Sequence, residues 1–216
     1  MEKKGVFISM EGPDGSGKTT NVGFLRECLQ EHGFQVVTTR EPGGSPIAEQ
    51  LRQIILTQYM ESDAELLLFA AARADHISKT IKPALAGGYV VLTDRFCDST
   101  VAYQGYGRGL LEKVRELEQF VHAGFYPDHT LFFDIPFEEC ISRLSKRVDK
   151  QDRIDQEAVE FKRRVWFGYQ RQFNDNQHRM VRINALEDLS DVQRQIQNWV
   201  HEEFAPKHRH LQHYPR

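Results

Sequence analysis

The chain has 216 residues, 40% of them hydrophobic, which is enough apolar material for the core of one ordinary domain and excludes a disordered chain. Lys and Arg number 28 against 31 Asp and Glu, so the formal net charge is −3. A protein that coats nucleic acid needs excess positive charge, so this balance argues against that class. Any anion site has to be local.

The three cysteines, Cys28, Cys97 and Cys140, are odd in number and far apart, which fits neither a disulfide framework nor a C-x-x-C metal motif. The apolar run after the first four residues is too short for a signal peptide, and no window approaches the roughly 18 apolar residues of a membrane span. We therefore expect no export, no membrane contact and a location in the reducing cytoplasm.

Five short apolar or β-branched runs alternate with longer segments of helical period. The predicted strands lie at 5–10, 35–39, 89–94, 129–134 and 179–184. This alternation is typical of an α/β fold, in which helices cover both faces of a parallel sheet. We expect one domain over residues 1–205 and a flexible C-terminal tail over 206–216, whose histidines His208, His210 and His213 imply no firm metal geometry.

Three helices are predicted between these strands, at 21–32, 63–85 and 111–123. The second is apolar on nearly all sides, so we expect it to be buried on nearly all sides. The segment 143–155 is rich in Lys and Arg and has little hydrophobic period after Leu144. It is interpreted either as a solvated loop with a charged helix end or as a lid over the active site.

The strongest motif is a complete match to G-x-x-x-x-G-K-S/T between the first predicted strand and the first predicted helix. It consists of Gly12, Pro13, Asp14, Gly15, Ser16, Gly17, Lys18 and Thr19, and Thr20 follows it in the helix. Its glycines let successive N–H groups point at a phosphate, and the helix N-terminus adds partial positive charge. Lys18 is expected at the β- and γ-phosphates of a nucleoside triphosphate, and Thr19 at Mg²⁺.

Polar residues at two other strand ends indicate a second phosphate. Arg40 follows the second strand, while Asp94 ends the third and Arg95 follows it. The carboxyl ends of parallel strands share one rim, so both arginines are expected near Lys18, with more positive charge than one triphosphate and Mg²⁺ require. Asp94 is interpreted as the acid that holds the metal, directly or through water. The alternative for the Asp94–Arg95 pair is a structural salt bridge or a helix cap.

Six segments in unbroken order over residues 5–200 resemble thymidylate kinases of bacteria and their phages. They are EGPDGSGKTT, TREPGGSPIAEQLR, LLLFAAARADH, LTDRFCDSTVAYQG, YPDHTLFFDIP and DRIDQE. The resemblance implies a P-loop kinase fold with strand order 2-3-1-4-5, and transfer of the ATP γ-phosphoryl group to dTMP with Mg²⁺ as cofactor. It also implies a homodimer, for which the apolar helix 63–85 is one candidate surface.

The resemblance assigns roles on the acceptor side. Asp14 would bond the sugar 3′-OH, Phe69 would stack on thymine, and Tyr103 would crowd the 2′ carbon. The remaining dTMP-binding residues that it implies are Arg40, Pro42, Arg73, Arg95, Thr100 and Gln104. From the sequence alone, Phe69 also suits a core position, and Tyr103 and Gln104 also suit the packing of a short helix.

Phosphoryl transfer to an anionic phosphate oxygen needs no general base but does need cations on the transferred group. One branch of the family carries an arginine inside the P-loop, where this chain has Gly15, so the cation has to come from elsewhere. We expect Arg147 and Arg153 of the lid to supply it beside Lys18 and Arg95, and Arg143 to flank the adenine. The alternatives are a related kinase with another acceptor and a P-loop switch protein, although a switch needs no second phosphate site.

Overall fold

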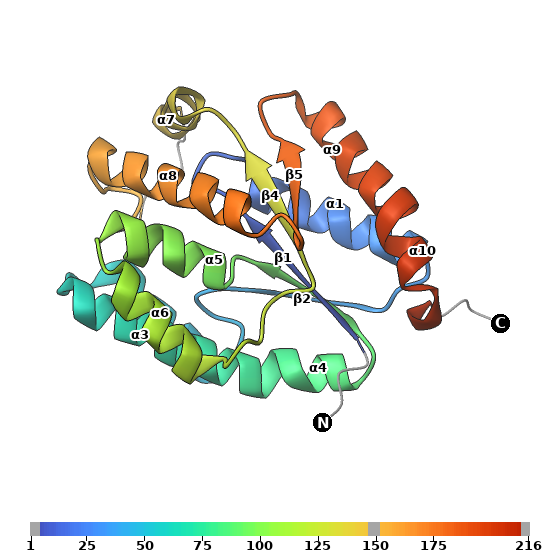
Figure 1. Cartoon of the computed structure of the whole chain (residues 1–216), viewed down its shortest axis with the longest axis horizontal. Coiled ribbons are helices and arrows are strands. Elements are labelled where there is room, and N and C mark those ends of the chain that lie inside the picture. Colours follow the sequence, from blue (N-terminus) through green and yellow to red (C-terminus); the bar gives the residue numbers. More distant parts are fainter. Residues whose placement is uncertain (1–4, 147–151, 213–216) are drawn as a thin grey trace.

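The computed structural model describes residues 5–146 and 152–212. Its centre is a sheet of five parallel strands, β1 (Val6–Glu11), β2 (Val36–Arg40), β3 (Val90–Asp94), β4 (His129–Asp134) and β5 (Met180–Asn184). The strand order is β2-β3-β1-β4-β5 (Figure 1). The predicted fold class is confirmed, and each strand begins and ends within one residue of its predicted bounds.

Side chains of β1 alternate between the two faces of the sheet because successive residues of a strand point to opposite sides. Ile8 and Met10 pack with α1 (Lys18–Glu31) and α9 (Leu189–Asn198) in one core cluster. Phe7 packs with residues of α4 (Lys82–Ala86) and α5 (Cys97–Thr100) in another cluster. The sheet is therefore covered on both faces, with α1 and α9 on one side and α4 and α5 on the other (Figure 1).

The predicted helix 63–85 is formed by α3 (Ser62–His76), the π-helical segment η1 (Ile77–Ile81) and α4. The expectation that it is buried on nearly all sides is wrong. Leu67 is 57% exposed, and Ala71 and Ala74 on the following turns are exposed as well. Spacings of three and four residues place these side chains on one stripe that faces away from the sheet.

Further helical segments pack around the sheet and its neighbouring helices. They are α2 (Pro46–Thr57), η2 (Val101–Gly107), α6 (Leu111–Val121), α7 (Phe137–Ser145) and α8 (Val159–Asp175). Among them, α8 lies against Phe132 of β4. A side chain at Gly168 of α8 would lie 3.0 Å from the Ala102 Cα in η2, so only glycine allows this approach. The close contact fixes α8 against the segment that carries Tyr103.

The chain after α9 continues through η3 (Trp199–Phe204), α10 (Ala205–Lys207) and η4 (Arg209–Leu211). Leu211 is buried in the same cluster as α1 and α9, and Gln212 forms a β-bridge with Phe34. This packing differs from the flexible tail expected over 206–216, as far as residue 212. The apolar side chain of Leu211, flanked by histidines, gave too weak a pattern to indicate it.

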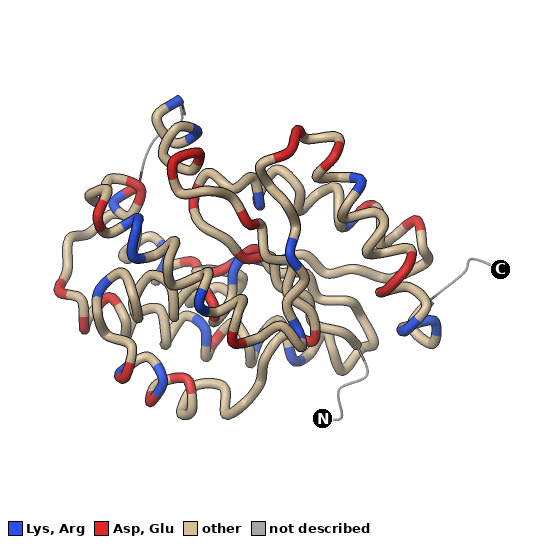
Figure 2. Tube along the Cα trace, turned by 45° about the horizontal axis from the view of Figure 1, so that its top comes forward, with Lys and Arg blue, Asp and Glu red and all other residues tan. Residues whose placement is uncertain are grey.

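No helix in the described part of the chain is long and apolar enough to cross a membrane. Basic and acidic residues are interleaved along the chain (Figure 2).

Candidate active site

The P-loop curls between β1 and α1 because its glycines adopt backbone angles that other residues avoid. Gly12 has a φ of 149°, and a Cβ at this position would lie 2.7 Å from the Phe133 carbonyl oxygen. Gly17 has a φ of 86° and forms the N-cap of α1. The loop therefore opens at the positive end of the α1 dipole, which is a site suited to a phosphate.

Lys18 lies at the start of α1 and is only 5% exposed. Its Nζ donates to the Pro13 carbonyl oxygen at 2.9 Å and lies 3.4 Å from the Ser16 hydroxyl. Burial, followed by the nearby positive charge of Arg95, lowers the pKa of Lys18 to about 8. The ammonium group thus lies in the loop where an anionic ligand would compensate both effects.

Thr19 and Asp94 meet because β1 and β3 are neighbours in the sheet. The Thr19 hydroxyl donates to Asp94 Oδ2 at 2.9 Å, whereas Asp94 Oδ1 is buried and has no hydrogen-bond partner among the described residues. A hydroxyl beside a carboxylate with one unused oxygen is the hard oxygen donor set that Mg²⁺ prefers. The two residues predicted from the sequence as metal-binding therefore fit that ion.

Arg95 follows β3 with a φ of 71°, in the left-handed region that side chains other than glycine rarely adopt. Its guanidinium group donates to the Gly12 carbonyl oxygen at 3.1 Å and to the Tyr169 hydroxyl at 2.6 Å. It also pairs with the Asp14 carboxylate. Strained backbone of this kind is found at functional sites, where the surrounding contacts hold it in place.

Glu11 at the end of β1 was missed by the sequence analysis, and it holds the segment around Arg95. Its carboxylate accepts from the Phe96 N–H at 2.7 Å and from the Ser99 hydroxyl at 2.6 Å, and Arg95 also donates to that hydroxyl. Burial, together with the nearby charge of Asp98, raises the pKa of Glu11 to about 7. The sequence around Glu11 gave no signal for this role, because the partners of its carboxylate are more than 80 residues away.

The arginines of β2 and α3 have carboxylate partners within the chain. Arg40 is largely exposed and donates to Glu49 at 3.1 Å. Arg73 is 4% exposed and pairs with Glu41 at 2.6 Å, while its guanidinium carbon lies 5.0 Å from the Phe96 ring centroid. Glu41 is therefore the hydrogen-bond acceptor that the buried Arg73 requires.

Tyr103 lies on η2, and its hydroxyl group donates to Asp14. Its ring lies 5.0 Å from the guanidinium carbon of Arg95, so Asp14, Arg95 and Tyr103 form one hydrogen-bonded group. Gln104 is buried and donates to Glu65 at 2.9 Å. These contacts fix the orientation of η2 beside the P-loop.

One cavity of about 750 Å³ connects these parts. The predicted residues that line it are Asp14, Gly15, Ser16, Gly17, Lys18, Thr19, Thr20, Arg40, Pro42, Phe69, Arg73, Asp94, Arg95, Thr100, Tyr103, Gln104 and Arg143. Gly12 and Pro13 shape the loop without lining the cavity. Arg52 and Leu56 of α2 also line it and were not predicted, because α2 was not recognised as a helix facing the P-loop.

Of the predicted lid arginines, Arg143 lines the cavity beside Leu189 and Val192, and Arg147 lies outside the described residues. Arg153 does not line the cavity. Its guanidinium donates to Glu65 at 2.6 Å and to the Ile55 carbonyl oxygen at 3.1 Å. The structure therefore does not bring Arg153 to the P-loop, because Glu65, which the sequence analysis did not consider, is its partner.

The sheet order, the P-loop and a cavity with cations at both ends define a P-loop protein of the kinase class. The family model of thymidylate kinase matches residues 10–196. A thymidylate kinase of Pseudomonas putida (strain GB-1) is 47% identical over 196 residues, covering 89% of this chain and 93% of the relative. The thymidylate kinase of Pseudomonas fluorescens (strain Pf0-1) is 48% identical, covering 89% of this chain and 93% of the relative. That of Hahella chejuensis (strain KCTC 2396) is 46% identical, covering 90% of this chain and 95% of the relative. The chain belongs to the thymidylate kinase family.

Proposed function

We propose that this protein transfers the γ-phosphoryl group of ATP to dTMP, forming ADP and dTDP. The observation that carries the proposal is the continuous cavity, which runs from the P-loop to Arg95, Arg73 and Phe69. A triphosphate on the P-loop leaves the arginine end free for a second, monophosphate ligand. The family membership supports this assignment of donor and acceptor.

On the donor side, the P-loop amides and Lys18 bind the β- and γ-phosphates of ATP. Thr19 and Asp94 hold Mg²⁺, which neutralises charge on the donor phosphates when bound. Arg143 and Leu189 line the end of the cavity that receives the adenine.

On the acceptor side, Arg95 and Arg40 bind the dTMP phosphate. Arg95 is held rigidly by its partners, whereas Arg40 is exposed and exchanges Glu49 for the ligand. Asp14 accepts a hydrogen bond from the 3′-hydroxyl group, and Tyr103, which donates a hydrogen bond to Asp14, fills the space that a 2′-hydroxyl would need. Phe69 and Arg73 contact the base, with Pro42, Thr100 and Gln104 completing the pocket.

The chemistry follows from positioning and charge, because the attacking phosphate oxygen is already anionic and needs no base. Lys18 and Arg95 stabilise the charge that develops on the transferred group. Arg147 and Arg153 of the lid supply further positive charge to that group. For Arg153, this role requires the guanidinium group to leave Glu65 when both nucleotides are bound.

We further propose a homodimer that works in the cytoplasm. The three cysteines are free and buried, in line with a reducing compartment. Leu67 of α3 and Phe120 of α6 are 57% and 88% exposed, on helices that lie side by side (Figure 1). Covering these side chains is the contribution expected of a partner copy. Sedimentation of the Phe120→Glu variant tests this surface. We expect this variant to be a monomer, whereas a dimer formed through another surface would not dissociate.

The acceptor is tested by measuring ADP formation from ATP with dTMP, dUMP, dGMP, dCMP and UMP in parallel. We expect dTMP to give the highest kcat/KM and UMP to be rejected because of its 2′-hydroxyl. If dTMP gives no more ADP than ATP alone, the proposed function is wrong. The Tyr103→Phe variant keeps the ring and removes only the hydroxyl group that bonds to Asp14, which separates steric exclusion of UMP from positioning of Asp14.

A further inference from the structure

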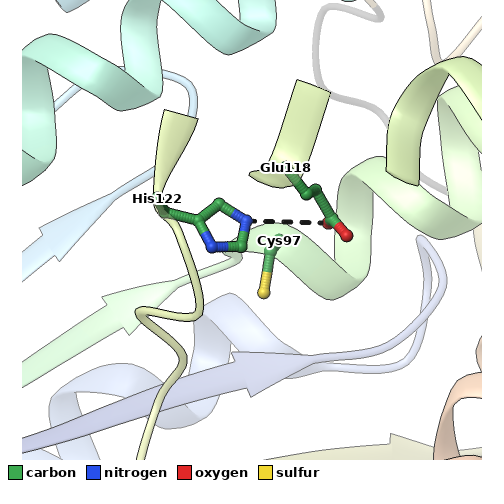
Figure 3. A group of neighbouring side chains, drawn as sticks. All are labelled: Cys97, Glu118 and His122. Carbon is green, nitrogen blue, oxygen red and sulfur yellow. Dashed lines mark ion pairs between the residues drawn. The ribbon is translucent and has the colours of Figure 1, made fainter. Parts of the chain in front are cut away.

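A group of three metal-ligating side chains lies outside the catalytic cavity. Cys97 begins α5, Glu118 lies on α6, and His122 directly follows α6. One ligand atom from each residue lies within 4.8 Å of the other two, and none of the three residues lines the cavity. Figure 3 shows the His122 ring and the Glu118 carboxylate facing each other, with the Cys97 side chain beside them.

Three polar atoms of this cluster lack hydrogen-bond partners in the described part of the chain. Both ring nitrogens of His122 and Oε1 of Glu118 are buried and unpartnered, and the His122 side chain is 0% exposed. His122 Nε2 lies 3.9 Å from Glu118 Oε1, which is too far for a hydrogen bond. The aromatic rings of Phe96 and Tyr126 lie beside the imidazole. Burying polar atoms without hydrogen-bond partners costs free energy, so these atoms indicate a site for a ligand that pairs with them.

The donor set suits a metal ion of the zinc class, for which thiolate sulfur, imidazole nitrogen and carboxylate oxygen are the usual ligands. Tetrahedral bonds of about 2.0–2.1 Å place nitrogen and oxygen ligands about 3.4 Å apart. The observed separation of 3.9 Å between His122 Nε2 and Glu118 Oε1 therefore needs a contraction of about 0.5 Å, and the set of ligand atoms that includes Cys97 Sγ lies within 4.8 Å.

Charge also fits, because one thiolate and one carboxylate neutralise a divalent cation. The nearby guanidinium groups of Arg73 and Arg179 are already paired with Glu41 and Asp98. Burial raises the pKa of the Cys97 thiol well above its ordinary value, and a metal ion reverses this preference by binding the thiolate directly.

We propose that Cys97, Glu118 and His122 bind one divalent transition-metal ion of the zinc class, with a water molecule at the fourth position. The Glu118 side chain is 13% exposed, which leaves a route to solvent for the ion and the water. The ion would join the start of α5 to the end of α6, two segments that are 21 residues or more apart in the sequence. It is a structural ion, separate from the catalytic Mg²⁺.

Cobalt(II) is the probe for this site, because a bound thiolate gives a sulfur-to-cobalt charge-transfer band that oxygen and nitrogen ligands do not give. The full chain, treated with a chelator and free of nucleotide, is titrated with Co²⁺, and zinc is then added in competition. We expect the band to saturate at one equivalent and to disappear when zinc displaces cobalt. Absence of the band in the folded wild-type chain would overturn the proposal.

Variants assign the ligands. Cys97→Ser should remove the band, and Glu118→Gln and His122→Gln should weaken Co²⁺ binding by at least about tenfold, since even indirect partners of a metal contribute that much. Cys28→Ser, another buried cysteine, is the matched control and should leave the band unchanged. A thiolate band retained in Cys97→Ser would refute the assignment.

The tail histidines could bind cobalt independently, so the titration is repeated with His208 and His210 replaced by glutamine. We expect the charge-transfer band and its stoichiometry to be unchanged in this chain. Loss of the band would show that a tail histidine and a cysteine share the metal, and would overturn the proposal. If Cys97→Ser does not fold, as judged by circular dichroism, Glu118→Gln decides: equal Co²⁺ affinity for this variant and the wild type would refute the site.

Discussion

The buried carboxyl group of Glu11 makes the stability of this protein depend on pH near neutrality. Glu11 is 0% exposed, and its oxygens accept from the Phe96 N–H and the Ser99 hydroxyl. Burial, with the charge of Asp98, raises its pKa from 4.5 to about 7, although Ser99 and Arg95 act in the opposite direction. The folded chain thus holds this proton more tightly than the unfolded chain.

Between pH 4.5 and about 7, the folded state binds more protons than the unfolded state at Glu11. The contribution of this group to the free energy of unfolding is therefore fully present below pH 4.5 and is lost as the pH rises through 7. At about 1.4 kcal/mol for each pKa unit, the difference amounts to at most about 3 kcal/mol.

The Glu11→Gln variant keeps the shape and one acceptor oxygen but cannot ionise. Raising the pH from 5 to 8 should lower the unfolding free energy of the wild type by about 2–3 kcal/mol more than that of the variant. Urea unfolding at both pH values measures it, and Glu27→Gln, an exposed position on α1, is the control. An equal pH dependence for Glu11→Gln and wild type would refute the argument.

Further substitutions test the roles proposed for the cavity. Lys18→Ala should abolish turnover in the ADP assay while the circular dichroism spectrum is retained. Phe69→Ala should raise the KM for dTMP by about tenfold, given the usual contribution of stacking on a base; a lower Tm with unchanged KM would place Phe69 in the core instead. Arg95→Ala should lower kcat at least about a hundredfold, and an unchanged kcat would exclude Arg95 from the transition state. Arg153→Ala should lower kcat with little change in the dTMP KM. If Arg153→Ala and Glu65→Gln both lower the stability of the protein and Arg153→Ala leaves kcat unchanged, the role of Arg153 is its ion pair with Glu65.

The strands and the P-loop were predictable because their signals are local, whereas the strand order was predicted from the family resemblance. Each strand is a short apolar run, and the P-loop is a contiguous motif placed between a strand and a helix. The exposure of Leu67 was not predictable, because composition shows that a helix is apolar but not which of its sides another element covers. Arg153 was assigned to the phosphates because the lid is basic and the P-loop has Gly15 where one branch of the family has an arginine. Its partner Glu65 lies 88 residues away.

The same limit applies to the parts of the site that sequence reasoning missed. Glu11 acts through Phe96 and Ser99, and no spacing rule joins a strand end to a helix 85 residues further on. Glu118 on α6 and His122 directly after it are four residues apart, which is a common pair spacing, and only the fold adds Cys97 to them. The carboxyl-edge rule did predict the meeting of Thr19 and Asp94, because the P-loop that leads to Thr19 follows β1 and Asp94 ends the neighbouring strand β3.

We propose that one cavity of this enzyme holds two phosphate-bearing nucleotides end to end. This arrangement is tested most directly by incubating the enzyme with Mg²⁺, dTMP and ATP that carries an isotopic label in the γ-phosphate, and by separating the products. We predict that the label appears in the β-phosphate of dTDP, in amounts equal to the ADP formed. Label released only as inorganic phosphate, with no labelled dTDP, would contradict the account.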